Sequence, residues 1–267
     1  MVEPQSSKLI TRVRFPSSPP FGTTRLPAQM FRCGGPPREI IFAMSISYFP
    51  DGGFWGTNDG PTPDSPLDWY VWHFTHVDNL AAIAAAGCIR CDDAVGEHKN
   101  VADEDIKARR RRVVVNADGY PRGRAVSSHV PWYFAARSPM LYRLKALRSD
   151  LVFFGMRIGD AIDAGLEFCA SDANAAAGIA SFSTDVAGFG SFIDFDLMTQ
   201  RDWYNTAEDM WRKSRRAAEF LVWQEVPLEV ISAAVTYSAS TMSVVRETLE
   251  QAGYGGINVS HRSSFYY

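Results

Sequence analysis

The sequence has little of several features that would fix its class at once. No apolar run approaches the roughly 20 residues that a membrane span needs, and no secretory signal opens the chain. We therefore expect a cytoplasmic protein with no membrane partner. Cysteines are few, and a zinc site needs two further ligands close to the Cys88 and Cys91 pair. We therefore expect no metal and reduced thiols at the four cysteines, Cys33, Cys88, Cys91 and Cys169.

An overall excess of positive charge is also missing. The formal net charge of -3 gives no global sign of a nucleic-acid partner, so such a partner would need a local basic patch. Residues 99–148 supply one, with 12 Lys and Arg against 4 Asp and Glu, and they include the run Arg109–Arg112. A phosphate backbone is attracted to such a patch, although a solvated helix end is the alternative interpretation.

Proline divides the chain into two parts. Eleven of the 15 prolines fall in residues 1–66, where they oppose long helices and regular strands. We predict that residues 1–66 form a disordered or irregular extension, and that residues 1–43 are a mis-assigned start or a dispensable tail, because Met44 opens a more protein-like stretch. Residues 67–267 form the predicted domain.

Short apolar runs and helical runs succeed one another within that domain without a repeat. They do not alternate strictly, which predicts an α+β domain rather than a doubly wound one, and no G-x-G-x-x-G motif follows a strand. The predicted strands are 69–75, 130–134, 151–157, 166–169, 218–223, 230–237 and 257–260. The predicted helices are 77–86, with Gly87 as its C-terminal cap, 103–112, 139–147, 208–216 and 242–252.

Several residues in these elements can carry chemistry. His73 and Thr75 lie two apart on a strand, so both side chains face one ligand, unless His73 is a strand histidine satisfied by its neighbours. Glu219 lies where a basic helix meets an apolar strand, which suits an acid–base group, although an exposed glutamate is the alternative. Arg137 precedes a helix start at Ser138, where backbone N–H groups bind anions. Tyr133 is the neighbouring aromatic residue most suited to face a ligand.

Five blocks in the same order carry a specific resemblance. They are His73–Leu80, Val130–Phe134, Arg137–Tyr142, Arg216–Val222 and Tyr266–Tyr267. Over residues 68–267 the chain resembles the DarT family of DNA ADP-ribosyltransferase toxins. The resemblance implies a PARP-like ADP-ribosyltransferase fold of the α+β class, with a split mixed β-sheet around an NAD cleft and flanking helices.

The resemblance also implies roles for individual residues. Glu219 and Arg110 match the catalytic residues, with Arg110 chosen from the arginine run because Ile106 and Val114 align best that way. The residues expected to bind NAD are His73, Thr75, Asn79, Leu80, Tyr133 and Arg137. Those expected to bind nucleic acid are Arg109, Arg111, Arg112 and Trp203, the last by stacking on a base.

The implied activity is transfer of ADP-ribose from NAD to a base of single-stranded DNA, with thymidine as the expected base. Nicotinamide is released and no metal is needed. An unpaired strand presents its ring nitrogens at no unpairing cost. The expected partner is a DarG-like antitoxin macrodomain protein that reverses the modification. The alternatives are a transferase acting on RNA, protein or a terminal 2′-phosphate, and a nucleic-acid-binding module that has lost catalysis.

Overall fold

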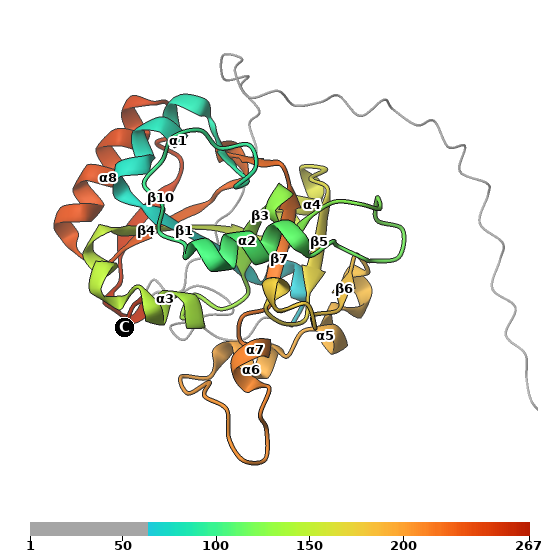
Figure 1. Cartoon of the computed structure of the whole chain (residues 1–267). Helices are drawn as coiled ribbons and strands as arrows, with labels where there is room; N and C mark the ends of the chain where they lie inside the picture. Colours follow the sequence, from blue (N-terminus) through green and yellow to red (C-terminus); the bar gives the residue numbers. More distant parts are fainter. Residues whose placement is uncertain (1–63) are drawn as a thin grey trace, which may run out of the picture. The chain divides into compact units, whose positions relative to one another are not determined.

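The computed structural model describes residues 64–267 (Figure 1). The predicted N-terminal extension, residues 1–66, lies almost wholly outside the described residues and stays a prediction. Within them, no helix is long and apolar enough to cross a membrane. The fold is of the predicted α+β class.

Most strands join one mixed sheet. Its order is β10-β9-β4-β1-β3-β7-β5-β6, and the β10–β9 pair is parallel whereas the others are antiparallel. A second sheet pairs β2 with β8. The strands are β1 Tyr70–His76, β2 Cys88–Arg90, β3 His129–Tyr133, β4 Leu151–Arg157, β5 Phe168–Ser171, β6 Phe182–Ser183, β7 Glu219–Trp223, β8 Glu225–Pro227, β9 Ala233–Thr236 and β10 Asn258–His261.

The large sheet is split between β1 and β3. Strand β1 pairs with β4 along its whole length, but it pairs with β3 only where Trp72 lies opposite Tyr133. Pro131 on β3 has no N–H to donate, and its carbonyl oxygen accepts a hydrogen bond from the His73 side chain instead, at 2.9 Å. The ladder therefore ends there, and we call this place the split.

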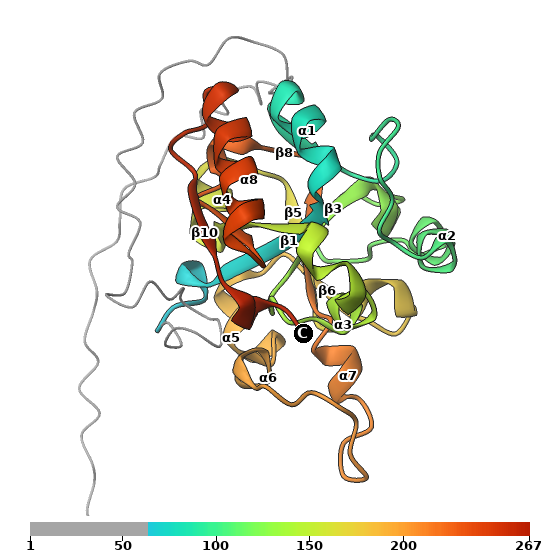
Figure 2. The same cartoon turned by 90° about the vertical axis from the view of Figure 1, so that its left-hand side faces the viewer.

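Helices flank the sheet. They are α1 Leu80–Ala86, α2 Glu104–Arg112, α3 Pro139–Arg143, α4 Ile158–Asp163, α5 Phe189–Phe192, α6 Phe195–Thr199, α7 Arg212–Arg215 and α8 Ala239–Gln251. Helices α1 and α8 pack side by side over one end of the molecule (Figure 2). Gly87 ends α1 with a φ of 71°, a left-handed conformation that glycine adopts without strain, so the predicted cap is confirmed.

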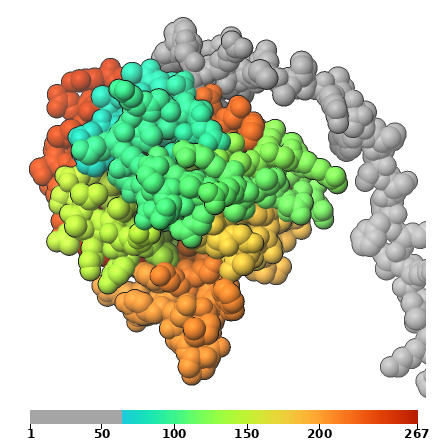
Figure 3. Space-filling model, viewed as in Figure 1, coloured from blue at the N-terminus to red at the C-terminus, as the bar shows by residue number. Residues whose placement is uncertain are grey.

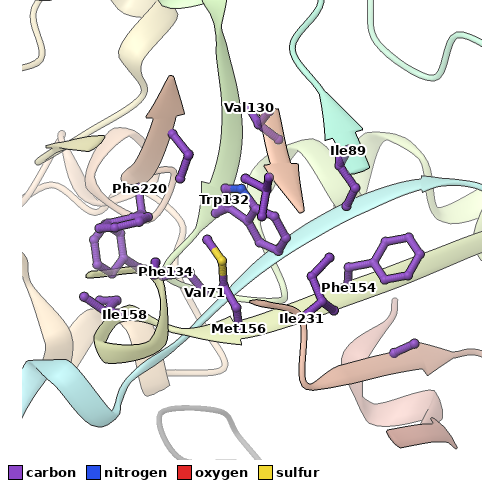
Figure 4. Close-up of a cluster of buried hydrophobic side chains, with 14 of the residues drawn as sticks. Val71, Ile89, Val130, Trp132, Phe134, Phe154, Met156, Ile158, Phe220 and Ile231 are labelled. Atoms are coloured by element: carbon purple, nitrogen blue, oxygen red, sulfur yellow. The ribbon is translucent and has the colours of Figure 1, made fainter. Parts of the chain in front are cut away.

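The core lies against the central strands. Val71, Trp132, Phe154 and Phe220 come from four adjacent strands and form one buried cluster (Figure 4). Burying each such side chain stabilises the fold by about 1.5–3 kcal/mol. Gly155 is needed in a second buried cluster, which contains Trp72, because a β-carbon there would lie 2.5 Å from the Trp72 ring. The core therefore holds β1 rigidly up to the residues that line the split.

Two local predictions differ from the structure. The predicted helix 208–216 shrinks to α7, because the Asp209 carboxylate accepts the Trp211 backbone N–H and binds the Arg215 guanidinium, which favours a turn. The predicted helix 139–147 likewise divides into α3 and the 3₁₀ helix Lys145–Asp150. Strands β2, β6 and β8 and helices α4, α5 and α6 were not predicted, because elements of two to six residues carry too little periodicity to be detected.

Candidate active site

A buried ion pair lies at the centre of the site. Arg110 on α2 donates a hydrogen bond from Nη1 to Glu219 Oε2 at 2.7 Å, although 109 residues separate them in the chain. The Glu219 side chain is 2% exposed and that of Arg110 is 11% exposed. Burial opposes the charge on Arg110, but the adjacent Glu219 carboxylate outweighs it and raises the pKa of the guanidinium. The charged guanidinium is thus held against the Glu219 side chain away from water.

Strand pairing fixes the position of Glu219. It opens β7, opposite Tyr133 on β3 and Ser171 on β5. The buried Ser171 hydroxyl accepts the Glu219 backbone N–H at 3.1 Å and donates to the Ala173 carbonyl at 2.8 Å. Ser171 was not among the predicted site residues, because only its register with Glu219 reveals it. The carboxylate therefore projects from a strand that is hydrogen-bonded on both sides.

Helix α2 delivers Arg110 to this carboxylate. Asp92, which follows β2, binds Lys107 at 2.7 Å and Arg111 at 3.3 Å, so two residues of the helix flank Arg110 and are anchored to one carboxylate. The Arg110 Nη2 atom is buried and has no hydrogen-bond partner among residues 64–267. An unpaired buried donor is costly, so this nitrogen is a natural donor to a bound substrate.

Arg110 is the member of the arginine run that faces Glu219. Arg109, Arg111 and Arg112 are exposed on the outer side of α2. Figure 3 shows the surface of this helix, coloured green, in the middle of one face of the molecule. The structure therefore separates one inward arginine from three outward ones.

His73 lies on the other side of the split. Its Nδ1–H donates to the Pro131 carbonyl at 2.9 Å, which leaves Nε2 as a hydrogen-bond acceptor. Burial lowers the pKa of His73 to about 4, and the nearby Arg110 charge acts in the same direction. The imidazole is thus neutral at physiological pH, and it can accept a hydroxyl proton but carries no charge of its own.

Tyr133 completes the cluster. It lies opposite both Trp72 and Glu219, so it stands at the split itself. Burial and the neighbouring Glu219 carboxylate raise the pKa of its phenol, which therefore stays protonated. His73, Arg110, Tyr133 and Glu219, predicted from four distant segments, are brought together.

The other residues expected to bind NAD have different surroundings from one another. The Asn79 amide donates to Thr75 Oγ1 at 2.9 Å and to the Lys99 carbonyl at 3.0 Å, so these two side chains are tied to the protein. The Leu80 side chain is part of the core cluster, and it supports α1 rather than facing a ligand. Arg137 precedes α3, and its guanidinium lies over the Tyr267 ring.

Trp203 lies in a different environment from the one expected. It is 4% exposed, and its indole N–H donates to the Tyr267 hydroxyl. A base cannot stack on a ring that is covered by protein, so this structure offers no open face there. Tyr204 and Trp211, on the same segment, are 58% and 60% exposed. Among residues 64–267 no cluster of three or more His, Cys, Asp or Glu could hold a metal ion.

The buried Arg–Glu pair and the neutral histidine lie at the split of a mixed sheet, and the class of fold is the PARP-like ADP-ribosyltransferase fold. Two solved structures share this fold. The structure titled "Thermus sp. 2.9 DarT in complex with ADP-ribosylated ssDNA" matches with a TM-score of 0.70 and 24% identity, over 77% of this chain and 99% of that one. The same Thermus protein in complex with NAD+ matches with a TM-score of 0.65 and 23% identity, over 77% of this chain and all of that one, 100%.

Sequence comparison narrows the class to one family. The family model described as "ssDNA thymidine ADP-ribosyltransferase, DarT" matches residues 72–267. A DNA ADP-ribosyl transferase of Mycobacterium tuberculosis is 47% identical over 218 residues, which cover 79% of this chain and 94% of the relative. The chain belongs to the DarT family, and it is an NAD-dependent DNA ADP-ribosyltransferase.

Proposed function

We propose that ADP-ribose transfer from NAD to thymidine in single-stranded DNA takes place at the split, with Glu219 and Arg110 as the catalytic residues. The observation that carries the proposal is the buried 2.7 Å pair between these two residues beside a neutral His73. Charge that is desolvated and fixed before the reaction stabilises a charged transition state strongly, because it needs no reorganisation.

The first part of the reaction breaks the bond between nicotinamide and its ribose. Nicotinamide leaves with the bonding electron pair, and the ribose acquires oxocarbenium character. The Glu219 carboxylate stabilises this positive charge while it binds a ribose hydroxyl. Arg110 engages Oε2, so Oε1 is the oxygen that faces the sugar. His73 Nε2 accepts a hydrogen bond from another NAD hydroxyl and orients the nucleotide.

The second part forms the new bond to the base. The ring nitrogen of thymine carries a proton, and this nitrogen attacks the ribose carbon as its proton moves to Glu219. Negative charge that develops on the adjacent thymine carbonyl is stabilised by the Arg110 Nη2 donor, which has no other partner within residues 64–267. The products are nicotinamide and a base-linked ADP-ribose. Glu219, Arg110 and His73 thus each have a part in the proposed reaction, and none of these parts requires a metal.

The DNA strand is proposed to lie between α2 and the segment that joins α6 to α7. Arg109, Arg111 and Arg112 are exposed on α2 and suit phosphate contacts. The connecting segment projects as a long loop, and it carries the exposed Tyr204 and Trp211 (Figure 1). These two rings, rather than Trp203, are suited to stacking on unpaired bases.

The partners follow from the chemistry of the product. A modified template base blocks replication, so we propose that a DarG-like macrodomain protein removes the ADP-ribose in the cell. Because NAD and DNA are the substrates, we also propose that the protein acts in the cytoplasm.

Mass spectrometry of oligonucleotides tests the activity. The protein is incubated with NAD and, separately, a thymidine-containing single strand, the same strand as a duplex, its RNA counterpart and a protein acceptor. We expect an ADP-ribose adduct on the single-stranded DNA alone. An adduct mainly on RNA or protein would replace the proposed acceptor, and nicotinamide release from none of them would indicate a binding module.

A further inference from the structure

Tyr267, the last residue of the sequence, contacts both Arg137 and Trp203. Its hydroxyl donates a hydrogen bond to the Arg137 carbonyl at 2.9 Å and accepts one from the Trp203 indole N–H. Its ring lies beneath the Arg137 guanidinium, 4.3 Å from the centroid. One side chain thus contacts both the arginine proposed to bind NAD and the segment proposed to bind DNA.

Further contacts hold Tyr267 in place. The Arg148 guanidinium donates to the Tyr267 carbonyl at 3.0 Å, and the Tyr142 ring meets the Tyr267 ring edge-on at 5.1 Å. Burial raises the pKa of the Tyr267 phenol, so its hydroxyl keeps the proton that it donates. These contacts fix the position of Tyr267, so Tyr267 can in turn position Arg137 and Trp203.

The Arg137 carbonyl also accepts a hydrogen bond from Arg216, which precedes β7. Arg216, which is 1% exposed, donates to it from Nε at 3.2 Å and also binds the carbonyls of Leu197 and Gln200. Glu219 lies three residues after Arg216, at the start of β7. The loop before α3, Tyr267 and Arg216, which precedes β7, thus meet at one carbonyl oxygen, and the same Arg216 side chain reaches the end of α6.

The Arg137 guanidinium retains an unpaired donor. Its Nε is buried and has no hydrogen-bond partner in the described part of the chain. A guanidinium held over an aromatic ring by cation–π attraction can still donate to an anionic group such as a pyrophosphate. The ring of Tyr267 therefore holds the position from which Arg137 offers this donor.

We propose that Tyr267 is a positioning residue with two separable parts: its ring orients Arg137 for NAD, and its hydroxyl fixes the Trp203 segment for DNA. The inference rests on the proposed roles of Arg137 and of the segment between α6 and α7. It adds a coupling between the two substrates, because both depend on one side chain.

Two substitutions separate the parts. Tyr267→Phe keeps the ring and removes both hydroxyl hydrogen bonds, so we expect the KM for the oligonucleotide to rise about threefold while the Kd for NAD changes by less than about twofold. Tyr267→Leu removes the ring as well, so we expect the Kd for NAD to rise about fivefold. Calorimetric titration with NAD and steady-state nicotinamide release give the two quantities.

A double-mutant cycle tests whether the ring acts through Arg137. Tyr267→Leu should weaken NAD binding in the wild-type background and have no further effect when Arg137→Ala is present. An equal effect in both backgrounds would show a general structural role and overturn the proposal. So would an unchanged NAD affinity in Tyr267→Leu.

The matched control is Tyr237→Phe, because Tyr237 also lies under an arginine, Arg148, at 4.8 Å. It should leave the NAD affinity and the oligonucleotide KM at the wild-type values. If Arg137→Ala alone leaves NAD binding intact, the positioning role of Tyr267 is refuted. The transfer activity itself is tested separately, by mass spectrometry of the oligonucleotide product.

Discussion

The residues at the split and the segment between α6 and α7 differ in almost every physical respect. At the split, Glu219 and Arg110 are buried and paired, and the strand that carries Glu219 is bonded on both sides. The segment presents Tyr204, Met210 and Trp211 at about 60% exposure. The rigid part suits chemistry, which needs fixed charges, and the exposed part suits a flexible polymer, which must enter and leave.

The largest effect is expected at the rigid part. Glu219→Gln keeps the size of the side chain, removes its charge and replaces one acceptor oxygen with an NH2 donor. We therefore expect transfer to fall at least ~100-fold, and the thermal unfolding midpoint to fall by several degrees because Arg110 loses its charged partner, with the variant still folded at the assay temperature. Single-turnover kinetics with labelled NAD measure the rate. A variant that transfers at more than a tenth of the wild-type rate would refute the role of the carboxylate.

A pair of neighbouring arginines provides the next test. Arg110→Lys loses the guanidinium geometry that reaches Glu219, so we expect roughly 10- to 100-fold slower transfer. Arg109→Lys on the exposed side of α2 should change the rate less than about threefold and act mainly on the oligonucleotide KM. Equal losses in the two variants would contradict the distinction between the inward and outward arginines.

The exposed segment gives a smaller and different effect. Trp211→Ala should raise the KM for the oligonucleotide about tenfold, because a stacked base is lost, while the Kd for NAD stays unchanged. Trp203→Ala should mainly lower the thermal unfolding midpoint, because it removes a buried ring, and should raise the oligonucleotide KM less than Trp211→Ala does. The interpretation fails if Trp203→Ala affects only DNA and Trp211→Ala only stability.

The smallest expected effect concerns how the free energy of unfolding depends on pH. Burial lowers the pKa of His73 and of His129 to about 4, whereas unfolded histidines titrate near 6.5. The unfolded state thus binds more protons between these values, and the free energy of unfolding falls as the pH drops from 6.5 to 4. The fall is at most about 1.4 kcal/mol per pH unit for each histidine.

Chemical denaturation at several pH values measures the slope of the free energy of unfolding against pH. His129→Gln should make this slope shallower, by an amount that corresponds to at most about one bound proton. A slope that is the same in the variant would mean that His129 does not contribute. The segment 200–211 contains no histidine, so it adds nothing to the effect.

The sequence predicted the fold class and the central strands well, because long apolar runs such as Leu151–Arg157 specify β4 directly. The resemblance also singled out Glu219 and Arg110, which are 109 residues apart in the chain and form the buried pair. Local patterns failed where a single contact decides the outcome, as with Asp209 and the shortened α7. Trp203 shows the same limit, because its burial depends on Tyr267, 64 residues away.

A crystal structure of Glu219→Gln with NAD shows where the nucleotide lies relative to the buried pair. We expect the nicotinamide ribose at the split, with a hydroxyl within hydrogen-bond distance of the residue 219 amide and another NAD hydroxyl bonded to His73 Nε2. NAD bound elsewhere, or with its nicotinamide ribose beyond reach of residues 110 and 219, would contradict the proposed site.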